Sequence, residues 1–207
     1  MKAADFETAY FALLKQLAAV DFSARKTLLG ADLQAGELLI PFYGMIHKVS
    51  RTGITDIKGR QINPALGVLL CTYVLRRPET IPAESNELVS FRELEGAGPL
   101  NGYFTENTQK LIARAFSGNV AALWQRSRLL GGVLDADPEE SYDLSVRFDA
   151  LPEIPVFLRF NDRDEEFPTQ CAILFRRSAE HYLDLQSLSI AGTFLAGFLI
   201  GNQTPTG

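Results

Sequence analysis

The stretch YDLSVRF, residues 142–148, decides the fold class of this chain. Every second residue from Tyr142 to Phe148 is apolar, and the residues between them are polar. Successive side chains of a β-strand point to opposite faces of the sheet. The alternation therefore predicts a strand that begins at Tyr142 and buries one face.

Two apolar runs continue this pattern. IPVFLRF (154–160) and TQCAILF (169–175) flank the polar segment NDRDEEFP (161–168), as the strands of a hairpin flank their turn. With 142–148 they predict an antiparallel meander that feeds helices at 178–184 and 185–201. The last helix is apolar all round but too short to cross a bilayer, so we expect it to be buried and expect no membrane span.

The first part of the chain combines helices with short strands. Residues 1–21 have the apolar spacing of an amphipathic helix. ELLIPFYGMIHKVS (37–50) and GITDIKGRQI (53–62) alternate between glycines, as short antiparallel strands do. Asn63 followed by Pro64 is the order expected for a helix cap and a first helical residue.

The middle of the chain connects these parts. LVSFREL (88–94) predicts a strand, and the glycine-rich GAGPLNGY (96–103) predicts a flexible turn because it lacks a phosphate-binding pattern. Thr105 and Asn119 are placed to cap two further helices. The fold class is therefore α+β: an antiparallel sheet of N-terminal short strands and a C-terminal meander, packed against several helices.

Length favours a single domain over residues 1–207. The loop PETIPAESNE (78–87) is the one seam at which the chain could divide, into an N-terminal subdomain, 1–78, and a C-terminal subdomain, 88–201. Residues 202–207, NQTPTG, are expected to form a loose tail.

Composition and charge exclude several functions. The formal net charge is −5 and no segment is densely basic, so we expect no nucleic-acid partner. The two cysteines, Cys71 and Cys171, are far apart, which predicts no disulfide, zinc or iron–sulfur site, no cofactor and a reducing cytoplasm. Asp5 and Glu7 interrupt the apolar core that an export signal would need.

The acidic turn is the first candidate site. Asp162, Asp164 and Glu166 would share one face if the strand continued through them, and three carboxylates could then collect a hard cation. The glycine and further ligands of a tight calcium loop are missing, so we expect no metal here. The alternative is a solvated hairpin tip whose charges keep a sheet edge soluble.

The same turn could instead provide acid–base chemistry. A carboxylate of Asp164, Glu165 or Glu166 pressed against an aromatic ring would have a raised pKa. Arg159 could then hold an anionic substrate, as could Arg92 beside Glu93.

Some charged residues also have structural interpretations. Arg92 could equally pair with a carboxylate of the acidic turn and tie two parts of the fold together. His47 and His181 have no metal-ligand spacing and are predicted to be structural or surface residues.

Five short strings in order resemble one family: FREL (91–94), LGG (130–132), FDALPEIP (148–155), DEEFP (164–168) and ILF with SAEHYL (173–183). They resemble DUF3786, a bacterial and archaeal family of domains of unknown function. Its members occur mostly in anaerobes and are sometimes fused to an iron–sulfur domain like those of corrinoid proteins. The resemblance implies no catalytic residues. Because this chain lacks the cysteine-rich partner, it implies no cluster of its own.

Two functional hypotheses follow. The first is a non-catalytic cytoplasmic binding or assembly module, connected by the resemblance with anaerobic metalloenzyme or corrinoid metabolism. Its partner would be a protein, a second copy of the chain in a homodimer, or a small ligand held by the apolar C-terminal helix or by a pocket between sheet and helices. The alternative is a small-molecule enzyme that uses the carboxylates of residues 162–166 with Arg92 as the anion holder.

Overall fold

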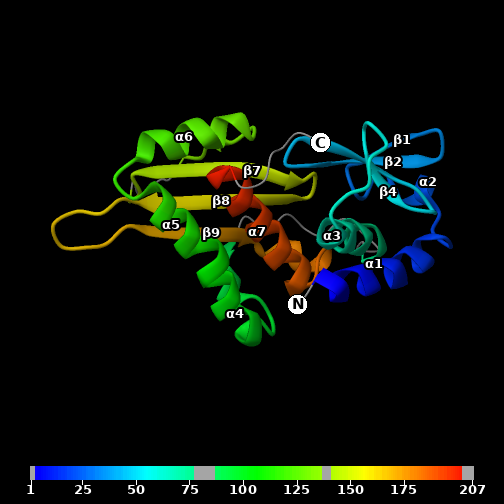
Figure 1. The fold of residues 1–207 in the computed structure, drawn as a ribbon, viewed down its shortest axis with the longest axis horizontal. Helices are drawn as coiled ribbons and strands as arrows, with labels where there is room; N and C mark the ends of the chain where they lie inside the picture. Colours follow the sequence, from blue (N-terminus) through cyan, green and yellow to red (C-terminus); the bar gives the residue numbers. More distant parts are fainter. Residues whose placement is uncertain (1–2, 77–86, 137–140, 202–207) are drawn as a thin grey trace.

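The computed structural model describes residues 3–76, 87–136 and 141–201 and shows two antiparallel sheets packed with helices (Figure 1). The helices are α1 (Ala3–Leu17), α2 (Phe22–Arg25), α3 (Pro64–Leu75), α4 (Gly98–Phe104), α5 (Lys110–Phe116), α6 (Val120–Leu129) and α7 (Leu185–Ile200). Two 3₁₀ turns, η1 (Phe91–Glu93) and η3 (Arg177–His181), and one π-helical turn, η2 (Thr105–Gln109), connect them. The fold is α+β, as the sequence predicts.

The four-stranded sheet has the order β1-β2-β3-β4. Its strands are β1 (Asp32–Gln34), β2 (Glu37–Phe42), β3 (Met45–Val49) and β4 (Ile54–Asp56). The five-stranded sheet has the order β5-β9-β8-β7-β6. Its strands are β5 (Leu88–Ser90), β6 (Val133–Leu134), β7 (Leu144–Leu151), β8 (Ile154–Asn161) and β9 (Gln170–Arg176). The predicted strands thus divide between two sheets.

The predicted meander forms with the expected pairing. Val146 in β7 lies opposite Leu158 in β8, and Phe157 in β8 lies opposite Leu174 in β9. One detail of the prediction is wrong: β7 begins at Leu144, and Tyr142 lies before the strand with 39 % of its surface exposed. Asp143 accounts for this start, because its backbone N–H donates to the side chain of Asn161 rather than to a strand partner.

Helix α7 connects the two sheets through one continuous core. Phe42 at the end of β2 and Tyr43 directly after it pack edge-on against Phe198 of α7, and the Tyr43 hydroxyl donates to the Ala191 carbonyl at 3.0 Å. The Tyr43 N–H also donates to the Ala150 carbonyl of β7. Buried apolar side chains from both sheets belong to the same cluster. The loop predicted as a possible boundary between subdomains, 78–87, lies outside the described residues except for Glu87. The predicted tail, 202–207, lies wholly outside them.

Local capping explains where several helices begin. Asn63 accepts from the Ala65 N–H at 2.9 Å at the start of α3, and Asn119 accepts from the Ala122 N–H at 3.0 Å at the start of α6. Both caps were predicted. Asp184 accepts from the Ser187 N–H at 2.8 Å and starts α7. Helix α7 ends at Gly201, whose φ of +82° is one that a side chain would strain.

Three predictions between β5 and α5 are wrong. Residues 91–93 form the 3₁₀ turn η1 rather than a strand, because the Glu93 carboxylate accepts from the Ser90 backbone N–H at 2.8 Å. The predicted flexible turn, 96–103, lies mostly in helix α4 (Gly98–Phe104), in which Phe104 is fully buried. Thr105 does not cap the start of a helix, because α4 runs through η2 into α5 without a break.

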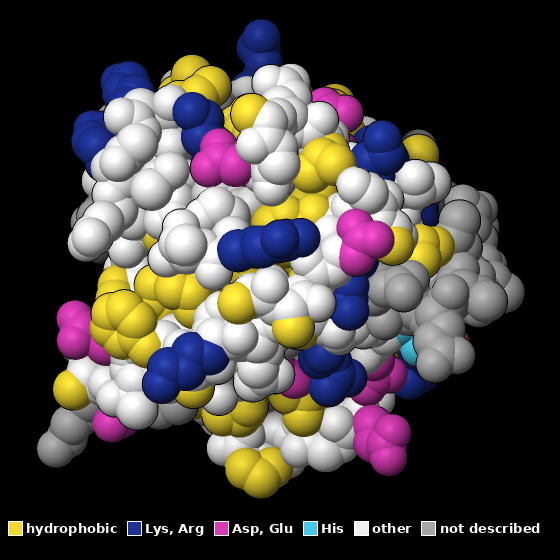
Figure 2. Space-filling model, turned by 90° about the vertical axis from the view of Figure 1, so that its right-hand side faces the viewer, with side chains coloured by type: hydrophobic (Ala, Val, Ile, Leu, Met, Phe, Trp, Pro, Cys, Tyr) yellow, Lys and Arg dark blue, Asp and Glu magenta, His cyan; other side chains and the backbone are white. Residues whose placement is uncertain are grey.

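Surface charge is mixed on the end of the molecule that carries α1, α2 and the four-stranded sheet. Figure 2 shows lysine and arginine side chains spread over this face among acidic and hydrophobic ones, without one dominant basic patch. In the described parts of the chain, no helix has both the length and the apolar character needed to cross a membrane. This agrees with the prediction of no membrane span.

His47 in β3 makes the stability of this sheet dependent on pH. The side chain is 5 % exposed, and its Nδ1 has no hydrogen-bond partner among the described residues. Burial lowers the pKa of the imidazole from its ordinary value of 6.5. The unfolded chain therefore binds this proton more readily than the folded protein does, and protonation favours unfolding.

We expect the free energy of unfolding to decrease as the pH falls from 6.5 to about 5, because the unfolded state takes up a proton that the folded state resists. His47→Leu should remove that part of the pH dependence. Urea denaturation of both proteins at several pH values across this interval measures it. Parallel curves for the two proteins would contradict the assignment to His47.

Candidate functional site

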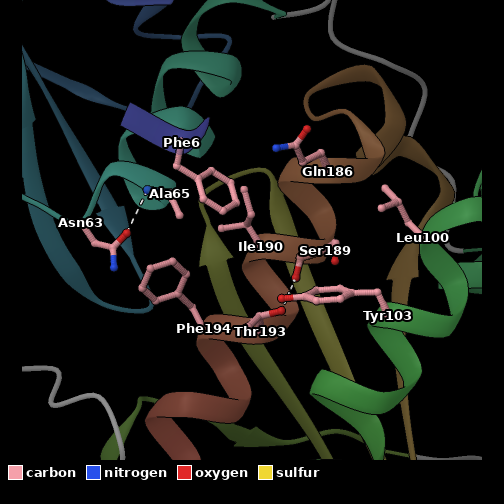
Figure 3. Close-up of a pocket in the computed structure, with 10 residues that line it drawn as sticks. All are labelled: Phe6, Asn63, Ala65, Leu100, Tyr103, Gln186, Ser189, Ile190, Thr193 and Phe194. Carbon is pink, nitrogen blue, oxygen red and sulfur yellow. Dashed lines mark hydrogen bonds between the residues drawn. The ribbon is translucent and has the colours of Figure 1, made fainter. Parts of the chain in front are cut away.

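The candidate site is a cavity of about 300 Å³ between four helices (Figure 3). Helix α7 forms its floor, α1 and the start of α3 form one wall, and α4 forms the opposite wall. The residues that line it are Phe6, Asn63, Ala65, Leu100, Tyr103, Gln186, Ser189, Ile190, Thr193 and Phe194. Concave, mainly apolar cavities with a few polar groups are the usual form of a small-molecule site.

The floor of the cavity is one face of α7. The lining residues from Gln186 to Phe194 recur at spacings of three and four, which places them on one side of the helix. Ile190 and Phe194 are nearly buried, whereas Gln186 and Thr193 are only half-buried. This face of α7 therefore belongs to the core through Ile190 and Phe194 and opens to the cavity at Gln186 and Thr193.

Helix α1 places Phe6 at the cavity through a close contact with α3. A Cβ atom on Gly67 of α3 would lie 2.6 Å from the Tyr10 ring of α1, so the absence of a side chain at Gly67 lets the two helices approach. The Tyr10 hydroxyl accepts from the Ile54 N–H at 2.9 Å and fixes the helix against β4. Phe6 lies one turn before Tyr10 and reaches the cavity from the same helix face.

Helix α4 is held against α7 by Phe104. The Phe104 ring stacks on Phe91 with 4.2 Å between ring centroids and an angle of 12° between planes. A Cβ atom on Gly192 of α7 would lie 2.5 Å from the Phe104 ring, so this contact requires glycine. Leu100 and Tyr103, on the same short helix, thereby reach the cavity.

The polar groups of the cavity are hydroxyls and amides. The Thr193 hydroxyl donates to the Ser189 carbonyl at 2.9 Å, and the Tyr103 hydroxyl points toward these two residues (Figure 3). Asn63 Oδ1 is occupied by the Ala65 N–H. Among the described residues that line the cavity there is no Asp, Glu, Lys, Arg or His. The site can therefore hold an uncharged molecule with an apolar body and a polar edge.

The acidic residues predicted as a site lie elsewhere, in the β8–β9 loop that projects beyond the sheet in Figure 1. Strand β8 ends at Asn161, so Asp162, Asp164 and Glu166 do not continue as a strand with one shared face. Asp164 accepts from the N–H groups of Glu166 and Phe167 at 2.8 and 2.7 Å, and these bonds lower its pKa. Glu165 and Glu166 are exposed.

Asp162 ties the acidic turn to the α5–α6 connection. Its Oδ1 accepts from the Gly118 N–H at 2.8 Å and from the Thr169 hydroxyl at 3.0 Å. The Gly118 bond is the main cause of its lowered pKa. Within residues 3–76, 87–136 and 141–201, no three His, Cys, Asp or Glu side chains come together in a way that could hold a metal ion.

Arg92 and Glu93 lie away from the acidic turn. They lie in η1, directly after β5, which pairs with Leu174–Arg176 of β9. From Leu174 to Gln170, where the turn begins, β9 extends about 13 Å. Arg92 is exposed, and Glu93 is hydrogen-bonded to Ser90. The structure thus separates the residues that the enzyme hypothesis requires to converge.

Arg159 is paired within the sheet. It is 6 % exposed, and its Nη2 donates to Asp135 Oδ2. Its guanidinium carbon lies 5.9 Å from the ring centroids of Tyr142 and of Phe157. This arginine is a structural residue of the sheet and does not line the cavity.

The remaining sequence candidates are also structural or surface residues. Cys71 is fully buried in α3, and burial raises the pKa of its thiol to about 12, so it carries no thiolate at neutral pH. His181 is exposed. Sequence reasoning pointed in general to the C-terminal helix and missed the individual cavity residues. The local signal for them was a few polar residues in a mainly apolar helix, among them Gln186, Ser189 and Thr193.

Comparisons with known proteins agree with the resemblance described above. A search of curated proteins and a search of solved structures each found no significant match. The family model described as Domain of unknown function (DUF3786) matches residues 21–197, which include every strand, helices α2 to α6 and most of α7. This chain therefore belongs to the DUF3786 family.

Proposed function

We propose that this chain is a non-catalytic binding module that holds a small, uncharged and mainly apolar ligand in the cavity between α1, α3, α4 and α7. The observation that carries the proposal is the lining: a cavity of about 300 Å³ built from four helices, with no charged side chain among its described residues. Burial of an apolar ligand there removes apolar surface from water on both partners.

The placement of the other candidates supports binding over catalysis. Asp164, Glu165 and Glu166 face solvent at one end of the five-stranded sheet, while Arg92 lies beside the other end of β9. Acid–base chemistry needs its groups within hydrogen-bond reach of one substrate. We therefore favour the binding module over the alternative enzyme hypothesis based on these residues.

The proposed setting is the cytoplasm, because both cysteines are free thiols in the structure and a reducing compartment suits them. The link to anaerobic metalloenzyme or corrinoid metabolism rests on the family resemblance alone. Within the proposal, ligand binding is the primary activity. Assembly with a protein partner or as a homodimer is a further use of the same module.

Ala65→Leu tests the proposal by adding volume inside the cavity. We expect it to weaken binding of a neutral probe about tenfold or more, because the added side chain occupies ligand space at the α3 wall. Ala12→Leu is the matched control, since Ala12 is exposed on α1 and does not line the cavity.

The measurement is titration calorimetry with indole, 1-methylindole, naphthalene and cyclooctanol, together with native mass spectrometry of the freshly purified protein. Thermal unfolding checks that both variants stay folded. Absence of binding for every probe to the unmodified protein would overturn the proposal. Equal loss of binding in Ala65→Leu and Ala12→Leu would also overturn it.

A further inference from the structure

We propose that the ligand of this cavity is a neutral aromatic ring that carries a hydrogen-bond donor, an indole-type N–H or a phenol-type O–H, and that Thr193 accepts this bond. The inference rests on the proposed function, because it specifies the ligand of the same site. Three features of the cavity lead to this inference: its aromatic walls, the Thr193 hydroxyl that already donates to the Ser189 carbonyl, and the absence of charged side chains from its described lining.

The aromatic part follows from the walls. Phe6 of α1, Tyr103 of α4 and Phe194 of α7 bring rings from three different helices to one cavity (Figure 3). Aromatic rings prefer offset-stacked or edge-on partners, and rings on several sides offer a flat ligand both geometries at once. An aliphatic ligand of the same size would gain only the burial of its surface.

The donor part follows from the hydrogen bonds already made. A threonine hydroxyl has one proton, and the proton of Thr193 is committed to the Ser189 carbonyl. While this bond is kept, the Thr193 oxygen can only accept a hydrogen bond from a ligand. Tyr103 is 51 % exposed and its hydroxyl can rotate, so it adapts to the ligand and selects neither donor nor acceptor.

The neutral part follows from the absence of charge. An ionised ligand that enters this cavity would lose its hydration and find no side chain of opposite charge among the described residues that line it. A carboxylate on the ring should therefore weaken binding strongly. These three requirements define a class that includes indoles and simple phenols and excludes aromatic acids.

The test compares indole with 1-methylindole, in which a methyl group replaces the donor proton. We expect indole to bind the unmodified protein about five to ten times more tightly, the usual contribution of one hydrogen bond. Thr193→Val keeps the shape of the side chain and removes the acceptor. It should bring indole to the affinity of 1-methylindole and leave 1-methylindole within about twofold.

Thr8→Val is the matched control. Thr8 makes the same kind of bond, from its hydroxyl to the carbonyl four residues earlier, but it is exposed on α1 and does not line the cavity. It should change neither affinity. Indole-3-carboxylate should bind at least tenfold more weakly than indole.

The outcomes separate this inference from the proposed function. If cyclooctanol binds as tightly as indole, or if Thr193→Val weakens indole and 1-methylindole equally, the ligand class is overturned while the binding function stands. If no neutral probe binds, both are overturned. Loss of indole binding in Thr8→Val would also contradict the proposal that Thr193 accepts the hydrogen bond from the ligand.

Discussion

Replacing Asp135 by alanine is expected to lower the free energy of unfolding by about 3–5 kcal/mol. The reason is the Arg159 guanidinium, which is buried in the five-stranded sheet and donates to the Asp135 carboxylate. Without Asp135 the positive charge stays away from water with no carboxylate to compensate it. The Nη1 of Arg159 already has no hydrogen-bond partner in the described structure, so the remaining contacts cannot replace the lost one.

A double-mutant cycle separates two contributions to this loss of stability: the missing Arg159–Asp135 ion pair and the buried Arg159 charge that is left without a partner carboxylate. Arg159→Met removes the buried charge and leaves a side chain that can pack between Tyr142 and Phe157, so we expect it to cost less than Asp135→Ala. The double variant should then be more stable than Asp135→Ala alone. Urea denaturation followed by circular dichroism measures all four proteins.

Asp149→Ala is the control for this cycle. Asp149 pairs with Arg147 on the same strand, but its side chain is 70 % exposed, that of Arg147 is 41 % exposed, and the closest oxygen and nitrogen are 3.6 Å apart. Its removal should change stability by less than about 0.5 kcal/mol. Equal effects of Asp135→Ala and Asp149→Ala would contradict the burial argument.

Phe104→Ala is expected to cost about 3–5 kcal/mol of stability. The ring is fully buried, stacks on Phe91 and packs near Phe175, with 6.1 Å between the ring centroids of Phe104 and Phe175. Its removal leaves a space beside Gly192, which has no side chain of its own to fill it. Because Leu100 and Tyr103 depend on this anchor, the cavity should also lose affinity for its ligand.

Thermal and urea unfolding measure the stability loss, and indole titration well below the unfolding temperature measures the effect on the cavity. Phe167→Ala is the matched control, since Phe167 is 59 % exposed at the tip of the acidic turn. It should leave stability within about 0.5 kcal/mol and leave binding unchanged. A Phe104→Ala protein that binds indole normally would show that α4 does not depend on this contact.

Much of the fold is readable from local sequence, because the signals act between close neighbours in the chain. Alternation in 144–148 and the apolar runs on both sides of the acidic turn predict β7, β8 and β9. Asn63 and Asn119 predict helix starts because their side chains bond to N–H groups two and three residues later.

The errors around η1 and α4 have two different causes. A local signal exists for η1, since Ser90 and Glu93 have the spacing of a capping box, but the apolar character of 88–94 favoured a strand. No local signal exists for α4, where three glycines in 96–103 oppose a helix. The burial of Phe104 against Gly192 and Phe91 overcomes that weak propensity.

The sequence by itself determined the α+β class, the meander, the buried C-terminal helix and the membership of the DUF3786 family. Only the tertiary structure decided where a ligand could bind. The cavity collects Phe6, Ala65, Tyr103 and Thr193 from four helices far apart in the chain, and no spacing or periodicity relates them. Their meeting depends on close helix contacts at Gly67 and Gly192, which are set by packing in three dimensions.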